Sequence, residues 1–376
     1  MSEIRVAFIL PGLGRVQRGA EMAFREVASQ LAGLPDMHVE VFGTGGRGLG
    51  QMKHHTVGCL PREKFERWPS LPCLRNEYQY EELSFILSLA GSGVFHPENF
   101  DITVTCTYPY ANWFVRRRRT SQGPLNLFVT QNGDWPCREK RREYRYFHCD
   151  GLICTNPEYF ERHRDQFRCA LIPNGVDPAV FRPSESRQTP ERCDNSGPVI
   201  LMVSALIESK AVIDGVRAAA RIKDARLIIA GDGPQREEVA RVAHELLPGR
   251  FRMLGNVDQQ RMPDLYREAD VFLHMSRDEP FGIVYLEAAS SGLPLVVHDS
   301  PTTRWILGDD AVFVDTRDPD AVARGLRNSM LSGTRSRMES AARRRVTTAW
   351  SWKIQALKYR NFMRETLTVS HQHGEN

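Results

Sequence analysis

The chain has 376 residues, of which 41% are hydrophobic and 26% are charged, and its formal net charge is +4. This composition is typical of a globular protein of about two domains, and so small a positive charge does not by itself indicate nucleic-acid binding. No apolar run approaches the roughly 18 residues that a membrane-spanning helix needs, and the N-terminus lacks the features of a signal peptide. The eight cysteines form no C-x-x-C pair, so we expect reduced thiols in a cytoplasmic protein.

Short apolar strands alternate with amphipathic helices along the first half of the chain. The predicted helices include residues 20–34 and 157–167, and Asn156 is expected to cap the second of these before a proline. A glycine-rich stretch at 43–51 begins an insertion of about 50 residues before the next predicted strand. Loops of such length more often have a function than not. The predicted strands are residues 5–10, 38–42, 101–105, 125–130, 151–154 and 170–172.

The same alternation continues after residues 174–197, which are rich in proline and serine and are predicted to be a linker. Predicted helices in the second half include residues 235–246 and 319–331. Twelve strands are many for one sheet, and strand–helix alternation indicates parallel sheets, so we predict two doubly wound α/β domains. Their predicted bounds are 1–175 and 190–352, followed by an aromatic-rich helix at about 353–370 and a disordered polar tail at 371–376. The strands in this half are residues 198–204, 226–230, 250–254, 270–274, 293–298 and 311–314.

The segment E-P-F-G-I-V-Y-L-E, Glu279 to Glu287, is the most informative motif. It follows an apolar strand, Gly282 allows close approach of a ligand, and a helix is predicted from about residue 282 to 291. The free N–H groups of Phe281, Gly282, Ile283 and Val284 at its start would form an anion site between two carboxylates. This arrangement suits a nucleotide-diphosphate sugar, although a helix with a structural glutamate near its start has the same pattern.

Further motifs occur in a fixed order: IPNGVD at 172–177, residues 203–210, GDGP at 231–234, ADVFL at 269–273, and residues 279–294. With them the chain resembles a retaining GT-B glycosyltransferase of the family-4 type, also called glycosyl transferases group 1. The resemblance implies two Rossmann-like domains facing across a cleft. It also implies that the C-terminal domain binds the nucleotide sugar, the N-terminal domain binds the acceptor, and the last helix crosses back to the N-terminal domain.

The resemblance also implies roles for individual residues. Glu279 would contact hydroxyl groups of the donor sugar, Glu287 would hold the ribose hydroxyls, and Lys210 would neutralise the diphosphate. Gly19, in the sequence R-G-A-E, matches the N-terminal glycine loop whose backbone approaches the phosphates. A surface lysine at a helix start and a simple helix cap are the alternative interpretations of Lys210 and Gly19.

Three positions depart from the family pattern. Ala205 stands where relatives have an arginine, Arg18 replaces the first glycine of the N-terminal loop, and Gln131 replaces a histidine. We therefore predict that Arg18 supplies the missing cation to the donor phosphates. Gln131 can hydrogen-bond a sugar but cannot act as a base, so Asp134 is the nearest ionisable candidate to orient the acceptor. Asp134 can equally cap the turn that follows it.

The acceptor domain has two further candidate features. Tyr108, Tyr110 and Trp113 follow a core strand and are predicted either to form a sugar-stacking surface or to pack at a helix start. The basic runs Arg116–Arg119 and Arg138–Arg145 are either a solvated face or a contact with a phosphorylated acceptor or with the inner face of an anionic membrane.

The predicted reaction is transfer of a sugar from a UDP- or GDP-sugar to an acceptor hydroxyl with retention of configuration. The acceptor would be a glycan, a lipid-linked saccharide or a metabolite. Neither a metal nor a cofactor is expected, because cationic groups and helix amides can stabilise the leaving diphosphate. A nucleotide-sugar epimerase of the same fold and a catalytically impaired binding protein are the alternatives. A dinucleotide-dependent oxidoreductase is disfavoured, because Gln17 stands where G-x-G-x-x-G requires its third glycine.

Overall fold

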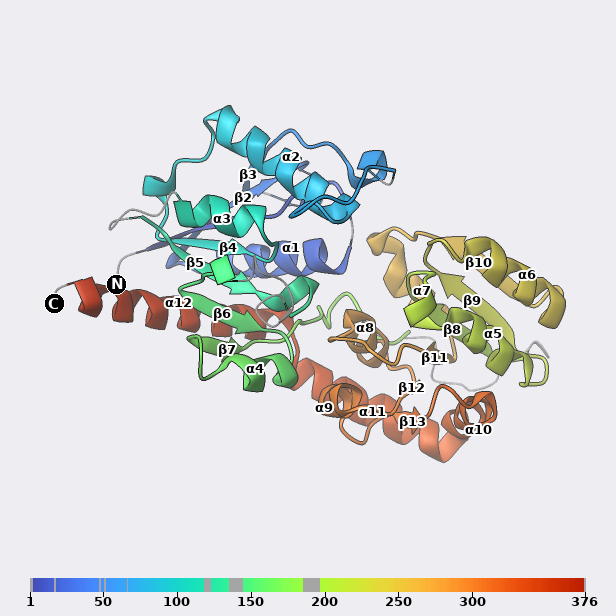
Figure 1. Ribbon diagram of the computed structural model, residues 1–376. Coiled ribbons are helices and arrows are strands. Elements are labelled where there is room, and N and C mark those ends of the chain that lie inside the picture. The colour runs from blue at the N-terminus through green and yellow to red at the C-terminus, as the bar shows by residue number, and fades with distance from the viewer. Residues whose placement is uncertain are drawn as a thin grey trace. The chain divides into compact units, whose positions relative to one another are not determined.

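The computed structural model describes residues 3–16, 18–46, 49–50, 52–65, 67–117, 123–134, 145–184 and 197–374. The chain forms two compact units, and the colour in Figure 1 follows the residue number along the chain. The first unit contains Met1–Asn174 and Trp352–Asn376, and the second unit contains Gly175–Ser351. The first unit is therefore built from both ends of the chain.

The sheet of the first unit has seven strands in the order β3-β2-β1-β4-β5-β6-β7, and their pairings are parallel. In the central strand β1, Val6 pairs with Val39 of β2 and with Ile102 of β4. Chain order reverses between β1 and β4, which creates a topological switch point. The strands are β1 (Ile4–Ile9), β2 (Met37–Gly43), β3 (Lys53–Thr56), β4 (Ile102–Thr105), β5 (Leu125–Val129), β6 (Gly151–Cys154) and β7 (Cys169–Leu171).

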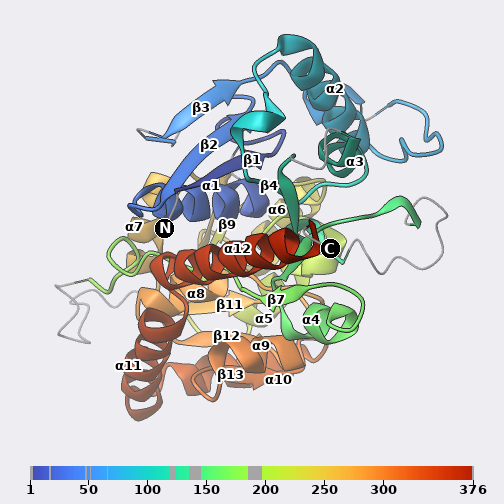
Figure 2. The same ribbon diagram turned by 90° about the vertical axis from the view of Figure 1, so that its left-hand side faces the viewer.

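Helices cover both faces of this sheet, because its central strands are buried on both sides. Phe8 of β1 packs edge-on against Phe24 of α1, whereas Ile9 belongs to a core cluster on the other face with Phe85 of α2. Helix α12 runs beside α1, as Figures 1 and 2 show. The helices are α1 (Gly19–Ala32), α2 (Glu77–Ser92), α3 (Tyr110–Arg117), α4 (Pro157–His163) and α12 (Trp352–Gly374).

The second unit has a six-stranded parallel sheet in the order β10-β9-β8-β11-β12-β13. Its switch point lies between the neighbouring strands β8 and β11, where ligands of open α/β sheets bind beyond the carboxyl ends. The strands are β8 (Val199–Val203), β9 (Arg226–Ala230), β10 (Phe251–Gly255), β11 (Val271–His274), β12 (Leu295–His298) and β13 (Val312–Val314).

Two core clusters fill the two faces of the second sheet. Leu201 and Phe272 pack with α7, α8 and α11, whereas Ile200 and Met202 pack with α5, α6 and α10. At α10, Asp318 caps the helix by accepting a hydrogen bond from the amide of Asp320. The helices are α5 (Val212–Ala220), α6 (Arg236–Leu246), α7 (Met262–Glu268), α8 (Ile283–Ser290), α9 (Pro301–Leu307), α10 (Pro319–Ser329) and α11 (Ser332–Ala349).

The prediction of two doubly wound α/β domains is confirmed, and all twelve predicted strands are present. The sequence did not predict β3, which is polar and mostly exposed, or α2, which lies inside the long insertion. The expected disorder of the tail from residue 371 is wrong as far as Gly374, because α12 continues to that residue. No helix in the described ranges combines the length and apolar character that crossing a bilayer requires.

Candidate functional site

Two predicted site residues meet at the switch point of the second unit. Lys210 ends a short 3-10 helix (Glu208–Lys210) that follows β8, and Glu279 lies in the loop after β11. Because β8 and β11 are adjacent parallel strands, their following loops meet at one edge of the sheet. The Lys210 Nζ donates to Glu279 Oε2 at 2.5 Å. The two side chains are 19% and 15% exposed, so the pair is partly shielded but reachable from solvent.

A buried histidine lies behind this ion pair. His274, the last residue of β11, is 3% exposed, and its Nε2 is 3.9 Å from Glu279 Oε2. Its Nδ1 is 3.0 Å from the hydroxyl of Tyr285 on α8. Burial, together with the charge of Lys210, lowers the pKa of His274 to about 3, so the ring is neutral near pH 7. If Tyr285 donates to Nδ1, the ring hydrogen is on Nε2, the nitrogen nearer Glu279.

Sequence reasoning did not select His274. It lies in the apolar run ADVFLHM, where a histidine is indistinguishable from a core residue. The sequence offered one signal for His274, namely its position at the end of the strand that precedes Glu279.

Gly282 fixes the turn between Glu279 and α8. It is the N-cap residue, with φ 70° and ψ 80°, and as a glycine it has no side chain with which to cap the helix. A Cβ at this position would lie 2.6 Å from the Tyr285 ring and 2.9 Å from Cγ of Glu279. The glycine is therefore required both by the left-handed backbone and by the packing that positions Glu279 and Tyr285.

The other residues of this helix start contribute backbone rather than side chains. The Phe281 ring is 3% exposed and packs against Trp305 and Trp350. Ile283 and Val284 are partly buried against the same core cluster. Their side chains are used in packing, and the predicted contact of their amides with an anionic ligand stays a prediction.

Glu287 lies one turn further along α8 and is 4% exposed. The Tyr266 hydroxyl donates to its Oε2 at 2.7 Å. Burial raises the pKa of Glu287 to about 7, and the hydrogen bond from Tyr266 opposes that increase. The predicted contact with ribose hydroxyls stays a prediction, and it requires that a ligand reach a carboxyl group that is nearly covered.

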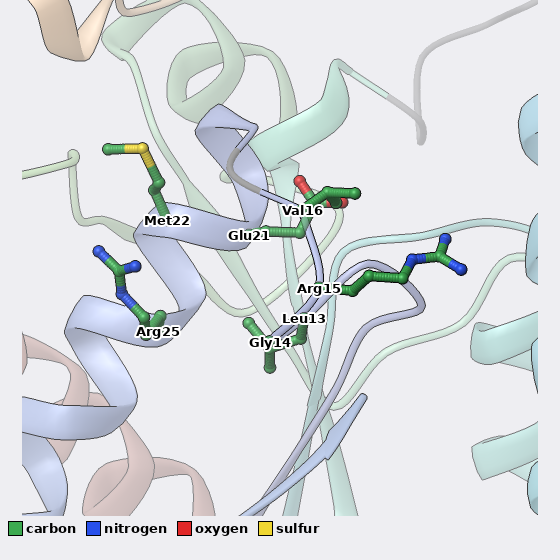
Figure 3. Close-up of a pocket in the computed structure, with 7 residues that line it drawn as sticks. All are labelled: Leu13, Gly14, Arg15, Val16, Glu21, Met22 and Arg25. Atoms are coloured by element: carbon green, nitrogen blue, oxygen red, sulfur yellow. The ribbon is translucent and has the colours of Figure 1, made fainter. Parts of the chain in front are cut away.

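In the first unit, Arg18 is the N-cap residue of α1 and Gly19 is its first residue. Arg18 Nη1 lies 3.3 Å from Glu81 Oε2 and 3.4 Å from Glu21 Oε1. A Cβ on Gly19 would meet no atom within 4 Å, so the space beside this residue is open. A small pocket runs along the start of α1 (Figure 3), and its lining residues are Leu13, Gly14, Arg15, Val16, Glu21, Met22 and Arg25.

The glycines of the loop before α1 have structural explanations. A Cβ on Gly12 would lie 2.2 Å from Glu21 Oε1, and one on Gly14 would lie 2.0 Å from the carbonyl oxygen of Gly45. These contacts account for both residues without a dinucleotide.

Asp134 and Gln131 follow β5 of the first unit. Asp134 Oδ1 lies 2.5 Å from Nε2 of the buried His163, and Asp134 Oδ2 pairs with Arg162. Both carboxylate oxygens thus already contact side chains of the first unit. The predicted role of Asp134 in orienting the acceptor stays a prediction. Gln131 is half-buried in a short 3-10 helix, Thr130–Asn132. The turn that Asp134 was alternatively predicted to cap lies outside the described residues.

The predicted sugar-stacking surface is wrong for Tyr108. Its ring is 1% exposed and packs with Phe128 and Phe147, because the loop after β4 is buried against the sheet. The Tyr110 hydroxyl donates to the carbonyl of Cys73, and the ring of Trp113 packs edge-on against both tyrosines. The alternative prediction, packing at a helix start, describes these residues.

The basic runs fall mostly outside the described residues. Arg116 donates through Nη1 to the carbonyl oxygen of Tyr146 at 2.8 Å. The side chains of the remaining residues of Arg116–Arg119, and most of the run at 138–145, are not among the described parts. Their contact with a membrane or with a phosphorylated acceptor stays a prediction.

Comparison with known proteins identifies a family for part of the chain. Residues 185–345 match the family described as glycosyl transferases group 1. The lipopolysaccharide core biosynthesis glycosyltransferase LpsE of Rhizobium meliloti is 28% identical over 207 residues, which cover 53% of this chain and 58% of LpsE. The chain spans about half the length of several curated relatives that it matches.

Two solved structures resemble the whole fold. Sucrose-phosphate synthase from Thermosynechococcus elongatus has a TM-score of 0.75 at 18% identity and covers 98% of this chain and 100% of its own. Anabaena HepE in complex with UDP-glucose has a TM-score of 0.71 at 14% identity, with coverage of 98% and 100%. These likenesses show the GT-B fold, as predicted.

Proposed function

We propose that this chain, whose residues 185–345 belong to the glycosyl transferases group 1 family, transfers a sugar from a nucleotide-diphosphate sugar to an acceptor hydroxyl. The observation that carries the proposal is the pairing of Lys210 with Glu279 beside the uncapped start of α8. This arrangement places a cation, free helix amides and a carboxylate at the switch point of the second unit.

Lys210 and the amides of Gly282 to Val284 are the proposed contacts of the donor diphosphate. When the bond between the sugar and the diphosphate breaks, negative charge grows on the leaving phosphate oxygens. Groups that are already in position stabilise this charge without reorganisation, which is the main source of rate enhancement in such sites. Because an ammonium group has three N–H donors, Lys210 can bind phosphate and still contact Glu279.

Glu279 is the proposed contact of the donor-sugar hydroxyls, and its carboxylate is held in place from two sides. Lys210 contacts Oε2, and the neutral ring of His274 lies behind the same oxygen. Tyr285 in turn contacts the second nitrogen of His274. We assign His274 and Tyr285 as positioning residues, because they act on the sugar only through Glu279.

The proposed reaction retains the anomeric configuration. The acceptor hydroxyl attacks on the face that the diphosphate leaves, and the leaving phosphate accepts the acceptor proton. In this route the sugar–oxygen bond to the diphosphate breaks as the bond to the acceptor forms, and neither a base nor a metal takes part. Gln131 remains a proposed acceptor contact, and Asp134, whose oxygens contact Arg162 and His163, is the proposed residue that orients the acceptor.

The proposed donor is a UDP- or GDP-hexose. HepE was solved with UDP-glucose, and a Mycobacterium tuberculosis relative is named a GDP-mannose-dependent mannosyltransferase. Proposed acceptors are glycans, lipid-linked saccharides and metabolites, in keeping with the lipopolysaccharide core named for LpsE. The epimerase and binding-protein alternatives lose support, because the matched family and these relatives are glycosyltransferases.

A thermal-shift screen with UDP, GDP, ADP and dTDP tests the donor site. A diphosphate present at 100 times its dissociation constant stabilises the folded state by about 2.7 kcal/mol. We expect one nucleotide to raise the melting temperature of the native protein, and Lys210→Ala and Glu287→Ala to lose most of this shift. The exposed Lys223, also in the second unit, supplies the matched control Lys223→Ala, which should keep the full shift.

Donor turnover then separates an enzyme from a binding protein. The native protein should release the sugar from its donor slowly in water and faster with a suitable acceptor. The configuration of the product, read by nuclear magnetic resonance, tests retention. Absence of any nucleotide-dependent shift, or equal shifts in both site variants and the control, would contradict the proposed donor site.

A further inference from the structure

Three arginines of the first unit converge on one buried carboxylate. Glu81 on α2 is 0% exposed, and its Oε1 accepts from Arg15 Nη2 at 2.9 Å. Its Oε2 accepts from Arg62 through Nε at 3.0 Å and Nη2 at 2.9 Å, and from Arg18 Nη1 at 3.3 Å. Arg15, Arg18 and Arg62 are called the arginine cluster below. Arg15 and Arg18 lie just before α1, and Arg62 begins a short 3-10 helix, Arg62–Phe65, so Glu81 joins two separate segments of the chain.

The arginine cluster carries more positive charge than the buried carboxylates balance. One arginine would neutralise Glu81, and among the described residues the other carboxyl group in contact with the cluster is Glu21, which contacts Arg18. Burial raises the pKa of Glu21, although the nearby Arg18 and Arg62 oppose this. Within the described part of the chain, three guanidinium groups therefore contact two carboxyl groups. A structural role for Glu81 alone does not explain this surplus, because like charges held close together repel one another.

The guanidinium groups also retain hydrogen-bond donors. Each has five N–H donors, and within the described residues the contacts with Glu81 and Glu21 use only one or two nitrogen atoms of each group. The three side chains are 30%, 30% and 26% exposed, so solvent reaches them while Glu81 stays covered. The planar N–H donors of a guanidinium group that is held in place and accessible to solvent can pair with two oxygens of a phosphate group.

The start of α1 adjoins the arginine cluster and adds a second feature of the same sign. Arg18 is the N-cap residue of this 14-residue helix, and its own side chain makes no capping hydrogen bond to the first turn. The open space beside Gly19 leaves the backbone there accessible. Helix amides and guanidinium groups together are a recurrent phosphate-binding combination.

We propose that Arg15, Arg18 and Arg62, held by Glu81 at the start of α1, form a receptor for a phosphate group on the first unit. The receptor belongs to the first unit, whereas Lys210 and α8 belong to the second. The proposal goes beyond the donor site proposed above, since it assigns two arginines that sequence reasoning did not select. The phosphate belongs either to the donor diphosphate, as predicted for Arg18 alone, or to a phosphorylated acceptor.

The test measures binding of inorganic phosphate, glucose 6-phosphate and UDP to the full chain by calorimetry. The Lys210→Ala background removes the cation of the proposed donor site, and phosphate binding that is then lost on substitution of an arginine reports the arginine cluster. In this background we expect Arg62→Gln and Arg15→Gln each to weaken phosphate binding roughly tenfold or more. Glu81 keeps two arginine partners in either variant, so the fold should be retained. Arg62→Lys, which keeps the charge but loses the fork, provides a second variant and should bind with intermediate affinity.

Arg5 provides the matched control. It lies on β1 of the same unit and donates to Asp101 through two nitrogens, so Arg5→Gln removes the same charge from a comparable ion pair. Arg5→Gln, made in the Lys210→Ala background, should bind phosphate with the same affinity as Lys210→Ala alone. Loss of glucose 6-phosphate binding without loss of UDP binding in Arg62→Gln, made in the native background, would assign the phosphate to the acceptor. Weaker UDP binding there would assign it to the donor.

Equal phosphate affinity in the parent, Arg62→Gln and Arg15→Gln would overturn the receptor. An equal loss in Arg5→Gln would also overturn it, because the effect would then come from net charge. Neither result touches the donor site, which the nucleotide response of Lys210→Ala and Glu287→Ala tests independently.

Discussion

Replacing Glu287 by glutamine tests the electrostatics of the second unit most directly. Glu287 has an ordinary pKa of 4.5 in the unfolded chain and about 7 in the folded protein, because burial disfavours its charged form. As pH rises above 4.5, the unfolded chain loses this proton before the folded protein does. Glu287 therefore contributes stability that is complete below pH 4.5 and is lost as pH rises to about 7.

The magnitude follows from the same two pKa values. One pKa unit corresponds to about 1.4 kcal/mol, so ionising Glu287 in the folded protein costs roughly 3 kcal/mol by pH 8 and less than about 1 kcal/mol at pH 5. Glutamine has the shape of the neutral acid and can still accept a hydrogen bond from Tyr266. Relative to the native protein, Glu287→Gln should therefore gain about 2 kcal/mol or more between pH 5 and pH 8.

Hydrogen exchange of peptides from β11 and α8, followed by mass spectrometry at several pH values, measures this difference within the second unit. Glu82 on α2 is the control, since burial also raises its pKa to about 7 but it lies in the first unit. Glu82→Gln should change the pH dependence of exchange in the first unit only. A difference between native protein and Glu287→Gln that stays constant from pH 5 to pH 8 would refute the reasoning.

Three further predictions concern the backbone and the arginine cluster. Gly282→Ala should destabilise the second unit by roughly 3 kcal/mol in thermal or urea unfolding. Gly249→Ala, where φ is 69° but the space around an added Cβ is open, should cost about 1 kcal/mol. Equal losses in the two variants would contradict the packing argument. Gly19→Ala should leave stability unchanged or raise it by up to about 1 kcal/mol, and should weaken nucleotide binding in calorimetry if the backbone there approaches phosphate; unchanged binding would exclude that approach. Arg18→Ala should reduce donor turnover far more than the melting temperature, since Glu81 keeps Arg15 and Arg62, and activity equal to the native protein would disprove the predicted role of Arg18.

Most of the fold could be predicted from the sequence, because its core strands are continuous apolar runs bounded by turn residues. Strand β3 was not predicted because it lacks such an apolar run. Its residues K-H-H-T are polar and mostly exposed, and it pairs at the edge of the sheet next to β2. Pairing there depends on backbone hydrogen bonds, which leave no apolar pattern in the sequence.

The candidate site was only partly predictable. Lys210 and Glu279 follow two strands that the rules of parallel sheets bring together, so their proximity could be inferred. The contact of His274 with Tyr285 could not, because both residues look like core positions. Tyr108 was misjudged because its loop position suggested exposure, whereas the structure buries its ring.

The arginine cluster shows the limit of sequence reasoning more clearly. Glu81 is 66 residues from Arg15 and 63 from Arg18 along the chain, and its surroundings in α2 were not recognised as a helix. Nothing local marks a glutamate that becomes fully buried. Tertiary packing brings Glu81 and its arginine partners together, and neither composition nor residue spacing predicts such long-range contacts.

Helix α12 has a consequence for how the protein is made on the ribosome. Trp352, Tyr359 and Phe362 of this helix are buried in the first unit, and the Phe362 ring packs so closely on β6 that a Cβ on Gly151 would lie 2.9 Å from it. The residues of the second unit are all synthesised before α12. The first unit begins synthesis earlier, but it cannot bind α12 until the second unit has been made. Until then, the surface of the first unit that α12 covers stays exposed. The second unit, a continuous stretch of chain, is therefore the first that can complete its own fold during translation.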